Sequence, residues 1–337
     1  MIPMARTLAE GPGIPGPHLH AGFTKDRWMV GTLGAMAPLA LLAGLALGPR
    51  AAVHLALGLG TALLLHLGLA LGERIVRGRV LHPSWTSSLV AGAIAALSSL
   101  AVAPYAVTAG IAALAVALKF AQGWVFGRKY LNPVAAAKVL LLGLMTATLG
   151  LERGLMYHPH HLDWIDMWTR EGFEGGLWFL AWGDWGPGLS LLLWKTHTWM
   201  GGVSGLATLF VGGLSAWLLR YKWRIPVSFL GTMGLLALLL AGLTRGDPLL
   251  RLAFHLFTGS VIFLAFFMAT EPQSTPMSAG GQYLFGVGLG ILTFLLQQLN
   301  VLGGSVLALV AMNLFTPLLD RVGLGRPVGL TRREHGR

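Results

Sequence analysis

The sequence predicts an all-α polytopic membrane protein of about ten transmembrane helices, arranged as two inverted five-helix repeats. Three observations predict this class. Of the 337 residues, 55% are hydrophobic and only 11% are charged, whereas an ordinary soluble domain carries about 25% charged residues. Apolar runs long enough to cross a bilayer, about 20 residues each, follow one another along the chain. The positions of these runs nearly repeat, and so much apolar content also excludes a disordered chain.

Ten segments meet the length and composition of a membrane span. The first five are 28–48, 51–72, 87–104, 105–121 and 133–152, and the second five are 200–218, 224–243, 250–271, 281–299 and 303–320. Only Pro104 separates the third span from the fourth. Because proline interrupts a helix, both two helices and one long broken helix fit that stretch.

A shift of 168 residues places the first five spans almost onto the second five. An odd number of spans in each half requires that the halves be inverted in the membrane, and inverted repeats commonly build a site between them from broken helices. The predicted organisation is an N-terminal tail 1–27, a first repeat 28–152, an external segment 153–199, a second repeat 200–320 and a basic tail 321–337.

The basic residues predict the orientation. Sixteen Lys and Arg residues fall in the tails and loops on one side of the predicted membrane and six on the other. Cytoplasmic loops carry the excess of Lys and Arg, so both termini are expected in the cytoplasm. The remaining two, Lys119 and Lys138, lie within spans, where snorkelling of the ammonium group to a nearby cytoplasmic helix end is the favoured interpretation.

Several classes of chemistry are excluded. The formal net charge is +11, but the basic residues lie in short loops, so no nucleic-acid partner is predicted. Cysteine is absent, which excludes disulfides, thiolate nucleophiles and cysteine-ligated iron–sulfur clusters in this subunit. No phosphate-binding glycine loop and no hydrolase triad is present. Neither a catalytic residue nor a metal site is therefore predicted.

The external segment 153–199 is rich in tryptophan and histidine. It holds seven of the twelve Trp residues together with His158, His160, His161 and His197. An interfacial belt of Trp side chains at the lipid headgroups is the favoured interpretation, and a docking or cofactor-covering cap is the alternative. The His158–His161 cluster could bind zinc or copper, although a solvated loop is favoured because no second ligand cluster accompanies it.

The stretch 268–281 interrupts the apolar pattern with two prolines, a carboxylate and several hydroxyls. Irregular polar backbone persists at membrane depth only where protein or water satisfies its polar groups. The alternative is a simple cytoplasmic turn.

Three sequence elements together resemble a membrane flavoprotein family. They are His255-Leu-Phe-Thr-Gly-Ser followed by Phe266-Phe-Met-Ala-Thr-Glu-Pro-Gln-Ser-Thr-Pro, the stretch Lys119–Pro133 that ends in Leu-Asn-Pro, and Ala311-Met-Asn-Leu-Phe-Thr-Pro-Leu-Leu-Asp. The family comprises the D subunit of Rnf electron-transport complexes and the B subunit of sodium-pumping NADH:quinone oxidoreductase. The resemblance covers roughly residues 25–322, with Glu271 where the family usually has Asp.

The resemblance implies a ten-helix inverted-repeat fold in a prokaryotic inner membrane. It also implies a subunit that carries electrons through flavin, coupled to movement of Na⁺ or H⁺, and that is not catalytic alone. The other membrane and peripheral subunits would be its partners, together with the lipid bilayer. The implied cofactors are FMN, joined covalently to a threonine, and riboflavin. The implied cofactor-binding residues are Thr208, Ser204, Gly205, Ala207, Lys119, Asn132, Thr270, Glu271, Ser274 and Thr275.

Two of the family's motifs are altered in this chain. The flavin-linking motif Asp-x-x-Ser/Thr-x-Ala-Thr corresponds to Gly202-Val-Ser-Gly-Leu-Ala-Thr208, which keeps only its last two residues and has Ser204 one position early. A helix-packing threonine is the alternative role for Thr208. The family's Asp-Gly-Ser motif before the third span is replaced by 83–88, which has no carboxylate.

Other functions stay open on the sequence alone. A non-redox channel or transporter with the architecture of urea channels also uses paired five-helix repeats, and a structural anchor that has lost its flavin sites is a third reading. His54, His66 and His255 lie within spans. Haem ligation by such histidines is disfavoured, because His54 and His66 are twelve positions apart and point to different helix faces. Lys119 and Lys138 would face a flavin or a quinone if they do not snorkel.

Overall fold

The computed structural model describes residues 25–78, 80, 84–101, 103–149, 192, 199–245, 248–257, 261–298 and 304–322. These residues are almost entirely helical, and the one pairing of β type among them is an isolated bridge between Leu100 and Trp199. The predicted all-α polytopic membrane class is therefore confirmed. The predicted external segment, with its histidine cluster, lies outside the described residues except for Leu192 and Trp199.

Helices of the first half begin and end at residues that suit helix boundaries. They are α2 (Lys25–Leu47), α3 (Pro49–Arg77), α4 (Thr86–Leu97), α5 (Tyr105–Phe126) and α6 (Pro133–Leu149). Gly48 has a φ of 72° and turns the chain from α2 into α3. Gly78 and Gly127, with φ of 67° and 69°, end α3 and α5 in the left-handed conformation that glycine adopts without a steric cost.

The second half is more fragmented. It consists of the 3₁₀ turn η3 (Met200–Gly202), α9 (Gly205–Leu218), α10 (Arg224–Thr244), α11 (Pro248–Phe257), α12 (Val261–Phe263), the π-helical turn η4 (Leu264–Met268), α13 (Ala279–Gln298) and α14 (Gly304–Leu319). The axes of α11 and of the α12–η4 segment differ by 56°.

Each of the ten predicted spans corresponds to a helix or to this bent pair in the described part of the chain. Five helices, α2, α3, α5, α10 and α13, are long and apolar enough to cross a membrane, and the bent pair would make a sixth span. The helices α4, α6, α9 and α14 are apolar but shorter. The arrangement of these spans as two inverted halves stays a prediction.

The predicted span 87–104 is wrong in its length. Helix α4 ends at Leu97, and α5 starts after Pro104, so the stretch forms two helices and the first is short. Carbonyl groups just beyond α4 bind partners outside the helix. The carbonyl of Ser98 accepts a hydrogen bond from the Lys138 ammonium, and the carbonyl of Ser99 accepts one from the Met200 amide at 3.0 Å.

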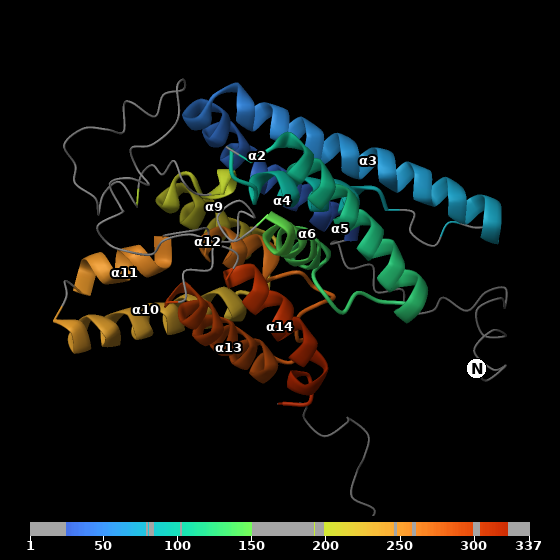
Figure 1. The fold of residues 1–337 in the computed structure, drawn as a ribbon. Helices are drawn as coiled ribbons and strands as arrows, with labels where there is room; N and C mark the ends of the chain where they lie inside the picture. Colours follow the sequence, from blue (N-terminus) through green and yellow to red (C-terminus); the bar gives the residue numbers. More distant parts are fainter. Residues whose placement is uncertain are drawn as a thin grey trace, which may run out of the picture.

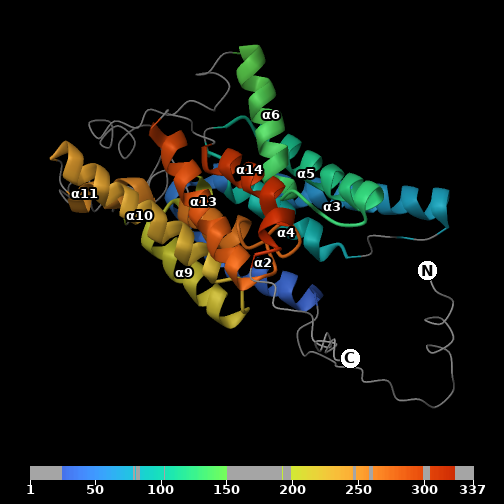
Figure 2. The ribbon, with the colours of Figure 1, turned by 90° about the horizontal axis from the view of Figure 1, so that it is seen from below.

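The two halves lie side by side, with the first half at the upper right of Figure 1 and the second half at the lower left. Figure 2 shows the same bundle from below. Contacts between α2 and α9, and between α6 and α14, join the halves. Nearly every residue of α4, and every residue of α12 and η4, is buried, so these short segments form the centre of the bundle. A helix that is apolar on all sides belongs in such a position.

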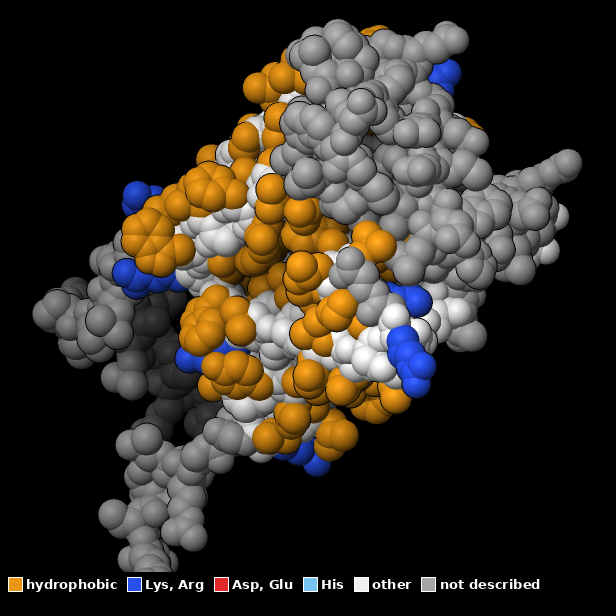
Figure 3. Space-filling view, turned by 90° about the vertical axis from the view of Figure 1, so that its left-hand side faces the viewer, with side chains coloured by type: hydrophobic (Ala, Val, Ile, Leu, Met, Phe, Trp, Pro, Cys, Tyr) orange, Lys and Arg blue, Asp and Glu red, His pale blue; other side chains and the backbone are white. Residues whose placement is uncertain are grey.

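The outer surface of the bundle is apolar. Figure 3 shows hydrophobic side chains over much of one face, with Lys and Arg toward its edges. Large exposed side chains include Leu64 and Leu71 on α3 and Leu235 and Leu243 on α10. Apolar surface of this extent marks contact with a membrane or a protein partner, and the lengths of these two helices suit a bilayer.

Close packing of α3 against α4 depends on two glycines. A Cβ at Gly58 would lie 2.6 Å from the carbonyl oxygen of Gly92, whereas a Cβ at Gly60 would meet nothing within 4 Å. Small residues permit such approach between membrane helices. We expect Gly58→Val to destabilise the protein by about 1–3 kcal/mol through overpacking, measured as a lower midpoint of thermal unfolding in detergent. Gly60→Val, on the same helix, is the control, and equal midpoints for the two variants would contradict this packing.

Candidate functional site

The ten candidate site residues fall into two groups in the structure. Lys119, Asn132, Thr270, Glu271, Ser274 and Thr275 surround the loop that follows η4, whereas Ser204, Gly205, Ala207 and Thr208 form the first turn of α9. The sequence elements Leu-Asn-Pro and Thr-Glu-Pro, which are about 140 residues apart, therefore meet in space.

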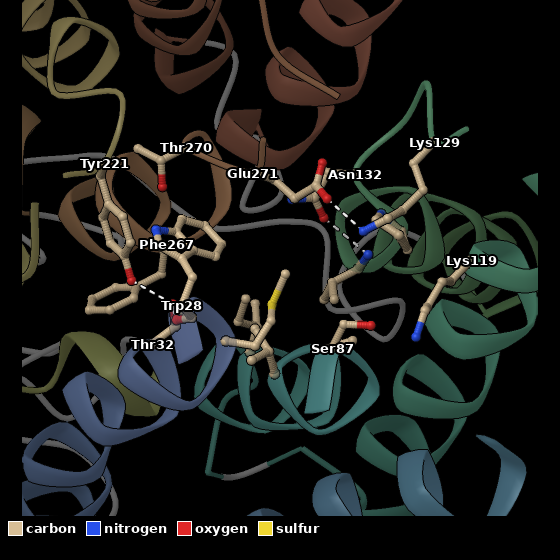
Figure 4. A pocket seen from close by; sticks show the side chains of 16 residues that line it. Trp28, Thr32, Ser87, Lys119, Lys129, Asn132, Tyr221, Phe267, Thr270 and Glu271 are labelled. Atoms are coloured by element: carbon tan, nitrogen blue, oxygen red, sulfur yellow. Dashed lines mark hydrogen bonds and ion pairs between the residues drawn. The ribbon is translucent and has the colours of Figure 1, made fainter. Parts of the chain in front are cut away.

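The first group surrounds a cavity (Figure 4). Its walls come from α2, α4, α5, the start of α6, η4 and the three loops that carry Lys129, Tyr221 and Glu271. The cavity is narrow, with a volume of about 50 Å³, below the range of small-molecule sites, about 300–1,000 Å³, and it opens at its mouth. Four of the ten candidates line it: Lys119, Asn132, Thr270 and Glu271. The other lining side chains are mostly apolar, including Val90, Ala91, Ile94 and Phe267.

An ion pair borders this cavity. Lys129 Nζ lies 2.6 Å from Glu271 Oε1. A second, outer cavity is lined by Lys25, Pro272 and Gln273, and it shares four residues with the inner one: Trp28, Met29, Lys129 and Glu271. The ion pair therefore stands at the boundary between the inner cavity and the outer one.

Asn132 holds the two motifs together. Its amide nitrogen Nδ2 donates to the Met268 carbonyl at 2.9 Å, at the end of η4. Its Oδ1 accepts from the Val134 and Ala135 amides at 3.1 Å, so Asn132 also caps α6. Its own backbone amide donates to Asn313 Oδ1 on α14 at 2.8 Å. One buried side chain thus fixes the start of α6 against the cavity.

The loop after η4 is held from several sides, so it is not a simple turn. The Ser274 carbonyl accepts from Asn313 Nδ2 at 3.0 Å and from Thr316 Oγ1 at 2.9 Å. Lys222 donates to the carbonyls of Pro272 and Thr275 at 3.0 and 2.9 Å. Burial lowers the pKa of Lys222 to about 8, against the opposing effect of Glu271 and Asp320. Backbone polar groups of this irregular stretch are therefore satisfied by protein, as its position requires.

The prediction that the two lysines within spans snorkel is wrong. Lys119 is 5% exposed and donates to Ser88 Oγ at 2.8 Å. Lys138 is 3% exposed, and its ammonium lies 3.6 Å from the centre of the Trp199 ring, a cation–π contact. Both side chains turn into the bundle, where carbonyl and hydroxyl oxygens or an aromatic face replace water.

Several site features could not be found from the sequence. The altered stretch 83–88 has no carboxylate of its own, but Asp26 at the start of α2 supplies one. Its Oδ1 accepts from Ser84 Oγ at 2.6 Å and from Thr86 Oγ1 at 2.7 Å. The cavity wall also includes Trp28 and Thr32 of α2, and Thr32 shares a 2.8 Å hydrogen bond with the Tyr221 hydroxyl. No local motif marks these α2 residues.

Thr208 lies in the second group of candidates, away from the cavity. Thr208 is 1% exposed, and its hydroxyl donates to the Gly201 carbonyl at 2.9 Å and to the Ser204 carbonyl at 2.7 Å. Ser204 Oγ caps α9 by accepting from the Ala207 amide at 3.3 Å. The α12–η4 segment connects the two groups, since Phe263 packs on Gly201 while Phe267 lines the cavity.

The histidines within helices bind to neighbouring side chains. His54 Nδ1 lies 2.7 Å from Thr108 Oγ1, and His255 Nδ1 lies 2.8 Å from Gln297 Oε1. Across the described residues, no group of three or more His, Asp or Glu side chains is placed to hold a metal ion.

The ion pair has a consequence in acid. Burial alone raises the pKa of Glu271, but Lys129 and hydrogen bonds from Lys129 and Ser274 outweigh it and hold the pKa below its ordinary value of 4.5. This contribution to stability is complete above that ordinary value and is lost as the pH falls through the folded-state pKa. We expect Glu271→Gln to lower the unfolding midpoint near neutral pH, and the deficit relative to wild type to shrink as the pH falls below 4.5.

The control is a double-mutant cycle with Lys129→Met. Residues in contact give non-additive effects, so Lys129→Met added to Glu271→Gln should cost little more than either change alone. Parallel pH profiles for wild type and Glu271→Gln would contradict the ion pair.

Comparison with known proteins gives a family. The model of the NQR2, RnfD, RnfE family matches residues 14–329. The chain is 28% identical over 332 residues to the D subunit of the Na⁺-translocating ferredoxin:NAD⁺ oxidoreductase complex of Acetobacterium woodii, covering 94% of each chain. It is 36% identical over 125 residues to the D subunit of the proton-translocating ferredoxin:NAD⁺ oxidoreductase complex of Clostridium ljungdahlii, covering 36% of this chain and 37% of that one.

A third relative comes from the other branch that the sequence resembles. The B subunit of the Na⁺-translocating NADH-quinone reductase of Pseudomonas paraeruginosa is 29% identical over 213 residues, covering 58% of this chain and 49% of that one. The family model spans nearly the whole chain, including both motifs that meet at the cavity. The chain therefore belongs to the NQR2, RnfD, RnfE family.

Proposed function

We propose that this protein is the membrane subunit of an ion-translocating electron-transport complex and that it carries electrons through a flavin held without a covalent bond in the cavity of Figure 4. The observation that carries the proposal is the meeting of the Asn-Pro and Glu-Pro elements around this cavity. Relatives along almost the full chain and along parts of it are named as subunits of such complexes.

The residues of the cavity suit a flavin. A flat ring system needs apolar walls, which Val90, Ala91, Ile94 and Phe267 provide. The polar edge of the ring needs a few hydrogen-bonding groups, which Lys119 and Thr270 on the same lining can supply. A bound flavin would supply the electron-accepting ring, and the protein would supply position and electrostatics. Riboflavin, which has no phosphate, suits a cavity whose Lys129 is already paired with Glu271.

A second flavin, FMN on Thr208, belongs to the same proposal. The first turn of a helix attracts a phosphate through its free N–H groups, and Thr208 lies in the first turn of α9. Its hydroxyl is buried against two carbonyls, and a threonine hydroxyl is a weak nucleophile without a base. A transferase must therefore reach the turn before it closes or must open it. The α12–η4 segment would then lie between the two flavins.

Partners and location follow from the same reasoning. The sequence has no nicotinamide-binding motif, so the electron donor and acceptor must be bound by other subunits in a prokaryotic inner membrane. The relatives include one named as Na⁺-translocating and one named as proton-translocating. The coupling ion proposed here is accordingly Na⁺ or H⁺. The proposed orientation has both termini in the cytoplasm, because the tails and loops on their side carry the excess of Lys and Arg.

A reduction experiment on the assembled complex tests the proposal. The complex containing this subunit is reduced stepwise, and flavin absorbance is followed in wild type and after removal of this subunit. Loss of a flavin signal together with the subunit supports the proposal. An unchanged flavin spectrum without the subunit would assign all of the flavin to other chains and would contradict it.

A further inference from the structure

A chain of three buried polar side chains runs from the cavity wall into the bundle. Lys119 on α5 lines the cavity, where Figure 4 labels it among the lining side chains. Lys119 Nζ donates to Ser88 Oγ on α4 at 2.8 Å, and Ser88 Oγ lies 2.9 Å from His66 Nδ1 on α3. All three side chains are buried, and only Lys119 lines the cavity.

The hydrogen bonds that join Lys119, Ser88 and His66 can all point toward His66 or all point toward Lys119. A lysine ammonium has only donors, so Ser88 Oγ accepts from Lys119 and keeps its own proton for His66 Nδ1. His66 is then neutral, with its proton on Nε2. In the reverse arrangement His66 Nδ1 carries a proton and donates to Ser88, which donates to a neutral Lys119 amine. Ser88 is the link in both arrangements, because its hydroxyl both accepts and donates.

We propose that Lys119, Ser88 and His66 form a proton relay that exchanges one proton between the cavity and the interior of the α3–α4–α5 packing. This inference rests on the proposed flavin in the cavity, whose reduction requires protons. In the step toward the cavity, the Nδ1–H bond of protonated His66 breaks as an O–H bond forms on Ser88. The original O–H bond of Ser88 breaks as an N–H bond forms on the neutral amine of Lys119. One proton moves, one positive charge is retained, and no electron is transferred.

The surroundings limit the relay to a single extra proton. Phe120 packs against His66, with ring centres 5.4 Å apart, and Lys119 lies over the face of the same ring. The charged groups that act on Lys119 are Lys25 from α2, Lys129 from the loop after α5 and Glu73 from α3. Asp26 of α2 reaches the chain through Ser84, whose carbonyl accepts from Lys119 at 3.4 Å. A second proton would make both Lys119 and His66 cationic, with only the Ser88 hydroxyl between them, and the repulsion between two like charges in this apolar setting is costly.

Burial of such a chain needs a functional reason. Ionisable groups inside membrane proteins are expensive and mark proton or ion pathways. A purely structural role would be served equally well by apolar residues, which often stabilise more than buried polar groups do. The relay explains why Lys119 and His66 are both ionisable and why one hydroxyl lies between them.

The test uses the assembled complex and measures how fast the cavity flavin takes up its proton on reduction. Ser88→Ala removes the link, and His66→Gln keeps an acceptor but removes the proton site. We expect either change to slow the proton-coupled step about 100-fold, the range of general acid–base catalysis, with flavin content unchanged. The matched controls are Ser98→Ala, a buried serine at the end of α4, and His255→Gln, a buried histidine bonded to Gln297. Wild-type rates in Ser88→Ala and His66→Gln would overturn the relay.

A second readout does not need the flavin. With ¹⁵N-labelled histidine, the nuclear magnetic resonance spectrum of wild type should show neutral His66 protonated at Nε2 only, and Ser88→Ala should shift the Nδ1 resonance, because it removes the hydroxyl that lies 2.9 Å from Nδ1. A mixture in wild type would overturn the relay even if flavin is bound. Absence of flavin from the complex would instead overturn the proposed function, and a single tautomer would then still establish the hydrogen bond between Ser88 and His66.

Discussion

Replacing Thr208 by alanine is expected to remove all covalently bound flavin from this chain. The resemblance assigns the phosphoester to the last residue of Gly202-Val-Ser-Gly-Leu-Ala-Thr208, and the structure describes that threonine in the first turn of α9. Without the hydroxyl oxygen no ester can form. The protein is produced with its partners and a flavin transferase, denatured, separated on a gel and illuminated, and the fluorescent band of wild type should be absent from the variant.

The control for this experiment lies on the same helix. Ser215→Ala removes another α9 hydroxyl, which donates to the Val211 carbonyl at 2.6 Å, and should leave the fluorescent band intact. A band of wild-type intensity in Thr208→Ala would place any covalent flavin elsewhere. A dark wild-type band would show that the altered motif, with glycine at 202 and 205, is not modified, and would leave the cavity flavin as the only carrier of this chain.

Filling the cavity is expected to remove the non-covalent flavin in proportion to the volume added. Ala91 lines the cavity from α4 and is buried there. A leucine at 91 would fill part of the space proposed for the flavin ring, and a phenylalanine would fill more of it. The amount of flavin released from the native protein should therefore fall in the order wild type, Ala91→Leu, Ala91→Phe, and should be nearly zero in the last. The measurement is flavin per chain after mild acid extraction.

Folding is controlled on the same helix. Leu89 also lies on α4, is only half-buried and does not line the cavity, so Leu89→Phe should retain the wild-type flavin content. Both variants must elute as single species in detergent with similar unfolding midpoints. Full flavin content in a folded Ala91→Phe protein would show that the flavin does not lie in this cavity.

The membrane helices and the protein-bound polar loop could be predicted because they depend on the composition of each segment. An apolar run as long as α3 or α10 must be a membrane helix, and irregular polar backbone such as the loop around Glu271 must be satisfied by protein. The link between that loop and Asn132 was not predicted, because nothing in the local pattern of either motif specifies its partner. The length of α4 was not predictable, since the apolar composition continues past Leu97 and the helix ends where the Ser98 and Ser99 carbonyls find partners from α6 and η3.

The missed parts of the site depend on tertiary packing. Hydropathy does not distinguish a lysine that reaches the membrane surface from one that turns inward, so the sequence alone favours the membrane surface for Lys119 and Lys138. Asp26 and Tyr221 are far in sequence from the groups they bind, Ser84 and Thr32. Each of these contacts joins two helices or a helix and a loop, and a single sequence holds no record of which elements meet.

The most direct test of the proposed electron-carrying role is to identify flavin released from the native, assembled wild-type protein. Non-covalent flavin is extracted from the complex, while covalently bound flavin stays on the protein. The released flavin is identified and its amount per chain is compared between wild type and Ala91→Phe. We expect riboflavin or FMN in proportion to the chain in wild type and its loss from the variant. A folded, assembled wild-type protein with no flavin in either the released or the covalent fraction would contradict the central claim that this subunit carries electrons through a flavin.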